Sequence, residues 1–161
     1  MTTAAGTATL TIGTLADTAA HVDSRPVAAF RARHPHVQVR IHETDLGDPT
    51  AGLRAGLVDV ALRLPAEADS AWTAYWTCGT PDGAAPQLRT IQECLQAVLW
   101  NGTSALAPLD QPLPAGLVTV PFTDRPPSRL VVAWSKTARS PLIRGFVRTA
   151  AEGYGAPDAG A

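Results

Sequence analysis

The sequence has few of the features that mark secreted or membrane-spanning proteins. Its 161 residues include two cysteines, Cys78 and Cys94, too few for a disulfide framework and typical of buried or free thiols in a reducing compartment. No apolar run approaches the roughly 20 residues that a membrane-spanning helix needs. The first six residues carry no positive charge, so they do not resemble the start of a signal peptide. We therefore expect a soluble, cytoplasmic protein.

Excess positive charge is also absent. The chain has 13 basic and 14 acidic residues, a formal net charge of -1, and Lys136 is its only lysine. A general nucleic-acid or membrane-surface binder carries a basic excess. We expect no direct nucleic-acid binding by this chain and no membrane partner. A chain of this length buries roughly 70% of its extended surface, so it needs no disulfide or metal to fold.

What the sequence does contain is an alternation of strands and helices between Thr9 and Leu64. Short apolar or alternating runs predict three strands, over 8–12, 37–41 and 58–62. Strands that are separated by helical crossovers form a parallel sheet, and ligands bind at the carboxyl ends of its strands. This stretch therefore predicts an α/β fold and the edge at which a site should lie.

Two helices are predicted between these strands. The first spans 14–33, and Pro26 either kinks it or starts a second segment with Ser24 as its cap. The second spans 49–55, with Asp48 as its N-cap and Gly56 as a left-handed C-cap.

The second half of the chain is expected to repeat the α/β pattern. Thr90 and Glu93 form a capping box that starts a helix ending at Gly102. Further strands are predicted over 103–107, 116–120 and 129–134, and a last helix over 141–152. The expected organisation is a flexible start, a first lobe, an aromatic and turn-rich connector, a second lobe and a flexible tail, at 1–7, 8–65, 66–89, 90–152 and 153–161.

Several segments in this order resemble one known family. Leu10–Gly13, Phe30–Pro35 and Leu53–Leu62 are similar to the first lobe of the effector-binding domain of LysR-type transcriptional regulators. Thr90–Val98 and Arg129–Trp134 are similar to parts of its second lobe. The resemblance implies a type 2 periplasmic-binding-protein-like fold, with two lobes and mostly parallel sheets flanked by helices. It also implies a small-molecule effector, a homodimer, and neither a cofactor nor a metal.

The sequence departs from the family pattern in two places. The first strand begins near residue 8, with no winged helix-turn-helix before it, so we expect a domain without a DNA reader. Only 65–71 separates the end of the first lobe from the aromatic segment that begins at Trp72, where the family has tens of residues. We therefore expect a truncated version of the fold, with a reduced second lobe or a cleft that a second copy of the chain completes.

The resemblance also implies a set of ligand-binding residues at strand ends and helix starts. They are Thr14, Leu15, Thr18, Thr44, Asp45, Arg63, Asn101, Thr103 and Phe122. Arg63 would clamp a carboxylate through its guanidinium, and the alternative for it is a surface salt bridge to Glu67 or Asp69. Thr14 and Thr18 are either ligand contacts or helix caps. A carboxylate or an aromatic molecule is the ligand class that these residue types indicate.

Two other functions remain open at this point. The fold could serve as an enzyme for a cyclisation or rearrangement in natural-product biosynthesis, with catalytic candidates His42, Asp45, Arg63, His21 and Cys78. The alternative for His42 is a solvated strand edge. The chain could also be a fragment that pairs with a full-length regulator.

Overall fold

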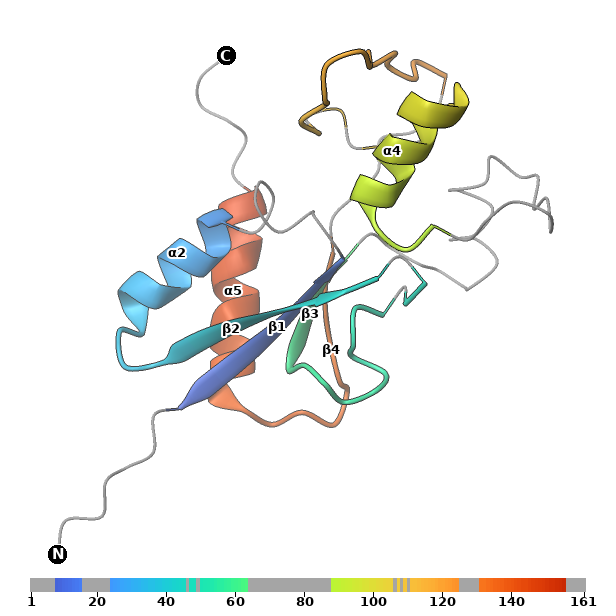
Figure 1. The fold of residues 1–161 in the computed structure, drawn as a ribbon. Coiled ribbons are helices and arrows are strands. Elements are labelled where there is room, and N and C mark those ends of the chain that lie inside the picture. The colour runs from blue at the N-terminus through green and yellow to red at the C-terminus, as the bar shows by residue number, and fades with distance from the viewer. Residues whose placement is uncertain are drawn as a thin grey trace, which may run out of the picture.

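A computed structural model of the chain describes residues 8–15, 24–45, 47, 48, 50–63, 88–105, 107, 109, 111–124 and 131–155. Its elements follow one another as β1 (Thr9–Leu15), α2 (Ser24–Arg33), β2 (Gln38–Thr44), β3 (Val60–Arg63), α4 (Ile91–Asn101), β4 (Val131–Trp134) and α5 (Pro141–Gly155). The α/β class that the sequence predicts is confirmed (Figure 1).

The four described strands form one sheet in the order β2-β1-β3-β4. β1 lies parallel to β2, with Ile12 beside Ile41, and parallel to β3, with Ile12 beside Val60. β4 is antiparallel to β3 and pairs Val132 with Leu62. The mostly parallel sheet is therefore confirmed, and the carboxyl ends of its first three strands point to one edge.

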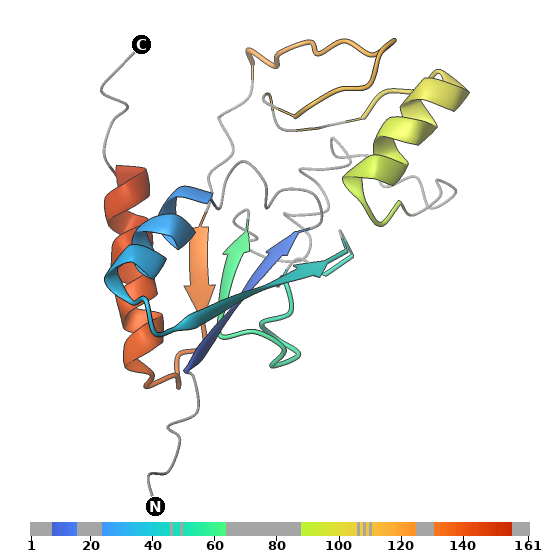
Figure 2. The same ribbon diagram turned by 60° about the vertical axis from the view of Figure 1, so that its left-hand side comes forward.

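One face of the sheet is covered by α2 and α5, which lie side by side in both views (Figures 1 and 2). This helix-covered face holds the main core, which contains Leu10, Ile12, Phe30, Val60, Leu62, Ile143, Phe146 and Ala150. The Phe30 and Phe146 rings meet edge to face at 5.5 Å between centroids. Phe30 comes from α2 and Phe146 from α5, so this contact fixes the two helices against each other.

The opposite face is covered by the turn segment 50–56, which lies almost directly on the backbone of β1. A Cβ atom on Gly13 would stand 2.0 Å from the carbonyl oxygen of Ala51. Ala51 and Ala61 are fully buried in a second, smaller core cluster here. Glycine at position 13 is therefore required because the turn segment occupies the space of a side chain.

A side chain continues the hydrogen-bond ladder just before β3. The backbone N–H of Thr11 donates to Oδ2 of Asp59 at 2.8 Å, and the N–H of Asp59 donates to the carbonyl of Thr11 at 2.9 Å. The Asp59 carboxylate therefore satisfies a backbone donor of β1, and it ties the start of β3 to β1.

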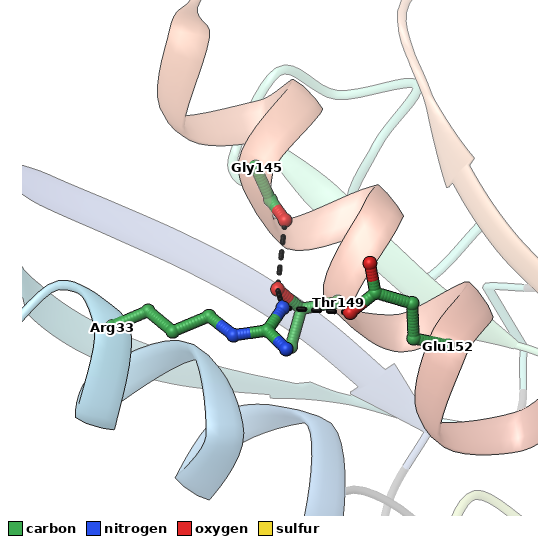
Figure 3. A network of polar contacts seen from close by, with 4 residues as sticks. All are labelled: Arg33, Gly145, Thr149 and Glu152. Carbon is green, nitrogen blue, oxygen red and sulfur yellow. Dashed lines mark hydrogen bonds and ion pairs between the residues drawn. The ribbon is translucent and has the colours of Figure 1, made fainter.

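A polar contact joins α2 and α5 outside the core (Figure 3). Arg33 donates from one guanidinium nitrogen to Glu152 at 2.7 Å and to the Thr149 hydroxyl at 3.2 Å. Thr149 in turn donates to the carbonyl of Gly145 at 3.0 Å. The Arg33 and Glu152 side chains are 54% and 52% exposed, so solvent limits this ion pair to about 1 kcal/mol or less. The apolar core does most of the joining.

The helix signals in the second half are confirmed where the structure describes them. The Thr90 hydroxyl accepts from the Glu93 N–H at 3.0 Å, while the Glu93 carboxylate accepts from the N–H of Arg89 at 2.6 Å. Gly102 ends α4 in a left-handed conformation, with φ at 63°. The Ser140 hydroxyl caps α5 by accepting from the Leu142 N–H at 3.2 Å.

Two predictions for the first half are wrong in detail. β1 runs to Leu15 and β2 to Thr44, so the strands end three residues later than predicted and Thr14 is not helical. α2 begins at Ser24, which agrees with a new segment around Pro26. The helix over 49–55 is not formed, because the described residues 50–56 make turns in which Ala51 and Gly52 have positive φ, at 49° and 82°. Gly56 does take the predicted left-handed conformation, with φ at 68°.

The strands predicted over 103–107 and 116–120 are also wrong, because the described residues in both ranges form no strand. Val118 and Val120 are 86% and 79% exposed, so neither packs against a neighbouring strand. β-branched residues favour strands only where such a neighbour is available. α4 itself lies beyond the carboxyl ends of β1 and β3 (Figures 1 and 2).

The second lobe was predicted over 90–152, but within that range β4 extends the sheet of the first strands and α5 completes their core. The division of the chain into lobes at 65 and 90 stays a prediction. The predicted connector over 66–89 lies outside the described residues, apart from its last two positions.

The contact between Gly13 and Ala51 predicts a large loss of stability when Gly13 is replaced by alanine. The added Cβ would overlap a backbone carbonyl that cannot rotate away, so we expect Gly13→Ala to lower the free energy of unfolding by about 2 kcal/mol or more. Gly153→Ala is the control, because nothing lies within 4 Å of its Cβ position and alanine favours the helix. Urea denaturation measures both. Equal stability of the two variants would contradict this packing.

Candidate functional site

The carboxyl ends of three parallel strands bring several predicted site residues to one edge of the sheet. Leu15 at the end of β1 lies beside Thr44 at the end of β2, and Thr14 lies beside Leu62 in β3. Arg63 follows Leu62 as the last residue of β3, and Asp45 follows Thr44 directly. The strand register therefore gathers the first-lobe candidates, as a parallel sheet requires.

Thr14 is the most unusual of these residues. It is 0% exposed, and its hydroxyl oxygen has no hydrogen-bond partner among the described residues. Its carbonyl accepts from the hydroxyl of Thr44 at 3.2 Å, which links the ends of β1 and β2. A buried hydroxyl without a partner costs free energy, and such groups in native proteins often belong to binding sites.

The acidic residues after β2 are engaged in turns. The Asp45 carboxylate accepts from the N–H of Gly47 at 2.8 Å. The Asp48 carboxylate accepts from the N–H and the hydroxyl of Thr50, at 2.9 and 2.6 Å, and from the N–H of Gly52 at 2.8 Å. These bonds fold the chain back over Gly13.

The environment of Asp48 favours its charged form. Burial opposes the charge and is the largest single influence on it. The bonds from the Thr50 hydroxyl and the two backbone N–H groups, with the charge of Arg54, outweigh burial and hold the pKa of the Asp48 carboxyl below its ordinary value of 3.8. Asp48 is therefore a charged turn residue at neutral pH and is no candidate general acid.

His42 and Glu43 lie on opposite faces of β2, as alternation along a strand requires. His42 is the register partner of Gly13, and its Cδ2 atom lies 3.4 Å from the Cβ position of Gly52, so its ring packs against the turn segment. Glu43 is the register partner of Thr14 and is exposed. The Asp45 carboxylate accepts from the N–H of Gly47, and no bond between Asp45 and His42 is seen among the described residues. The acid–base pairing of His42 with Asp45 stays a prediction.

The second-half candidates lie elsewhere. Asn101 is the last residue of α4, at the end of this helix that points away from the sheet (Figures 1 and 2). The Thr103 hydroxyl donates to the carbonyl of Ala97 at 3.4 Å, and Phe122 is 58% exposed. Thr18, His21 and Cys78 lie outside the described residues, as do the side chains of Leu15 and Arg63. The assignment of these residues to a ligand site stays a prediction.

The described residues offer little support for a cysteine nucleophile or a metal site. Burial and the nearby Glu93 carboxylate raise the pKa of the Cys94 thiol, which keeps it protonated and poorly nucleophilic at neutral pH. No three His, Cys, Asp or Glu side chains in the described part of the chain are grouped to hold a metal. An open depression of about 440 Å³ lies between Ala28 in α2 and Val37 just before β2, at the opposite end of β2 from its carboxyl end.

Sequence reasoning missed one property of this edge and one of its residues. It proposed Thr14 but gave no sign that the hydroxyl would be buried and unsatisfied, because that depends on the packing of the finished core. It did not propose Glu43 as a site residue. Strand alternation was the signal that could have placed Glu43 on the same face as Thr14, once the register of β1 and β2 was known.

The family model of the LysR substrate binding domain matches residues 4–75. The structure is also similar to the crystal structure of the PA01 protein from Pseudomonas aeruginosa, which is assigned to the LysR family of transcriptional regulators. The TM-score is 0.56 at 19% sequence identity, over 91% of this chain and 72% of the other. The chain has the fold of a LysR substrate-binding domain. No curated protein sequence matches it significantly.

The resemblance to LysR regulators is therefore confirmed for the fold. In the described part of the chain, no helix is long and apolar enough to cross a membrane. The family match covers all three parallel strands, and so it includes the edge that carries Thr14, Thr44 and Arg63.

The Thr14 hydroxyl, which has no hydrogen-bond partner among the described residues, predicts that Thr14→Val stabilises the fold. Valine has nearly the same shape and removes a buried polar atom that has no hydrogen bond, so we expect the free energy of unfolding to rise by about 1 kcal/mol. Thr149→Val is the matched control. Its hydroxyl is also buried but bonds to Gly145 and Arg33, so the same substitution should cost about 1 kcal/mol. Equal shifts in urea midpoint would contradict this contrast.

The lowered pKa of Asp48 predicts one part of the acid sensitivity of the fold. Because the folded state favours the carboxylate, the stabilisation is fully present above the ordinary value of 3.8 and is lost as pH falls through the lower folded-state pKa. Asp48→Asn should therefore be less stable than the parent near neutral pH, with a difference that shrinks below pH 3.8. Asp124→Asn, at an exposed position, is the control. A difference that stays constant with pH would rule out this linkage.

Proposed function

We propose that this chain is an effector-binding domain of LysR type that acts as a sensor or ligand-binding protein for a small molecule. The observation that carries the proposal is the Thr14 hydroxyl at the carboxyl end of β1, which is fully buried and has no partner in the described part of the chain. In a parallel α/β sheet, this end of the strands is where ligands bind. Burying the hydroxyl without a hydrogen bond costs free energy. A ligand that bonds to the hydroxyl would remove this cost.

The surrounding geometry supports the same position. Thr44 reaches across from β2 to the carbonyl of Thr14, and Arg63 ends β3 one residue beyond the register partner of Thr14. Three neighbouring strands therefore end at the same edge of the sheet, although strand alternation puts position 44 on the face opposite Thr14. A homodimer, which the LysR resemblance implies, is part of the proposal, and light scattering of the purified chain tests it.

A thermal-shift screen against aromatic acids and secondary metabolites, followed by calorimetry, tests effector binding. We expect at least one hit whose affinity falls tenfold or more in Thr14→Val, equivalent to about 1.4 kcal/mol. The variant should be more stable than the parent, so weaker binding cannot be blamed on unfolding.

Thr119→Val is the control for this experiment, because Thr119 is exposed in the segment 111–124, outside the sheet. Its affinity for the hit should equal that of the parent. If no compound binds, or if Thr14→Val binds every hit as the parent does, the proposed function is wrong.

A further inference from the structure

The row of side chains that contains Thr14 also contains a carboxylate. Thr14 in β1 lies between its register partners Glu43 in β2 and Leu62 in β3. Register partners in a parallel sheet point to the same face, and Leu62 belongs to the core under α2 and α5. Glu43 and Thr14 are therefore neighbours on the helix-covered face, at the carboxyl end of the sheet.

The two polar groups differ in exposure, since Thr14 is buried and Glu43 is exposed, but neither has a bonding partner among the described residues. The Thr14 hydroxyl has no hydrogen-bond partner, and the Glu43 carboxylate makes no hydrogen bond or ion pair in the described part of the chain. The two nearby carboxylates behave differently, because Asp45 and Asp48 both accept backbone N–H groups of their own turns. In the described part of the chain, Glu43 is thus a carboxylate at this edge whose two oxygens are both open to a ligand.

An exposed apolar side chain completes this corner. Ile41 precedes Glu43 by two positions in β2, so it lies on the same face, and it is 45% exposed. Its register partner Ile12 is fully buried, which shows that the helices cover β1 but leave the edge strand β2 partly open. The corner therefore combines an apolar wall, a carboxylate and a buried hydroxyl.

We infer that this corner takes an effector with a protonated amine on an apolar body. The inference rests on the proposed function and narrows its ligand class. Neighbouring strands are about 4.8 Å apart, and an ammonium nitrogen with a bond of about 2.9 Å to each of two oxygens can bridge them. An ammonium group supplies the donors that the Glu43 carboxylate and the Thr14 hydroxyl oxygen both lack.

The same geometry disfavours a simple anion at this position. A ligand carboxylate beside Glu43 would place two negative charges within a few ångströms of each other. Their repulsion would weaken binding, because the buried Thr14 position offers little solvent screening. The apolar body of the ligand would lie over Ile41. Because β2 is an edge strand, the ligand enters from the open side of β2 and its ammonium group reaches Thr14 last.

Calorimetry with three probes of matched shape tests the inference. The probes are 2-phenylethylamine, 2-phenylethanol and phenylacetate, which differ mainly in charge. We expect the amine to bind tightest and the carboxylate weakest. Glu43→Gln should weaken the amine tenfold or more while leaving the alcohol unchanged. Glu152→Gln makes the same change at an exposed position on α5 and should leave all three affinities at the parent values.

Each other outcome overturns the inference in a recognisable way. Tighter binding of phenylacetate than of the amine, or equal amine binding by the parent and Glu43→Gln, would show that the ligand class is wrong. If none of the three probes binds while a screen hit binds in a Thr14-dependent way, the ligand class is again wrong and effector binding stands. If nothing binds in either experiment, the proposed function fails as well.

Discussion

The close approach of the turn segment to Gly13 is the constraint on which the sheet depends. The Ala51 carbonyl fills the position of a side chain on β1, and the turn that carries it is held by the Asp48 carboxylate. This contact covers the face of the sheet that α2 and α5 leave open. A parallel sheet needs cover on both faces, so the arrangement at Gly13 lets β1 be a buried central strand.

Burial of β1 on both faces creates a conflict at its carboxyl end. Leu10, Ile12 and Thr14 follow one another on the helix-covered face, and all three are buried. The first two positions hold apolar residues that belong to the main core. The third holds a hydroxyl with no partner, where valine would fill the same space without the polar penalty. A destabilising residue at the edge where ligands bind is more readily explained by binding than by folding.

Features that depend on neighbours along the chain were predictable from the sequence. The cap at Thr90, the left-handed glycines at 56 and 102, and the start of α5 at Ser140 all involve contacts within a few residues. Features that depend on distant partners were not. Val118 and Val120 have the sequence pattern of a strand, but both are exposed and neither packs against a strand in the described part of the chain. The Thr14 hydroxyl loses its contact with water only when the core packs around it, and the sequence alone does not show this. The parallel direction of the first three strands was predictable, because strands that are separated by crossover segments leave few other topologies.

The position of Glu43 on an edge strand allows a purely structural explanation, because charged side chains on edges prevent pairing with other chains. A charge on an edge strand can prevent such pairing from either face of the sheet. Arg40 carries a charge on the same strand, on the opposite face, and would protect the edge equally well. A structural role also predicts that neutralising Glu43 raises self-association and leaves amine binding unchanged. A ligand role predicts the reverse, because only Glu43 shares a row with the unpartnered hydroxyl of Thr14.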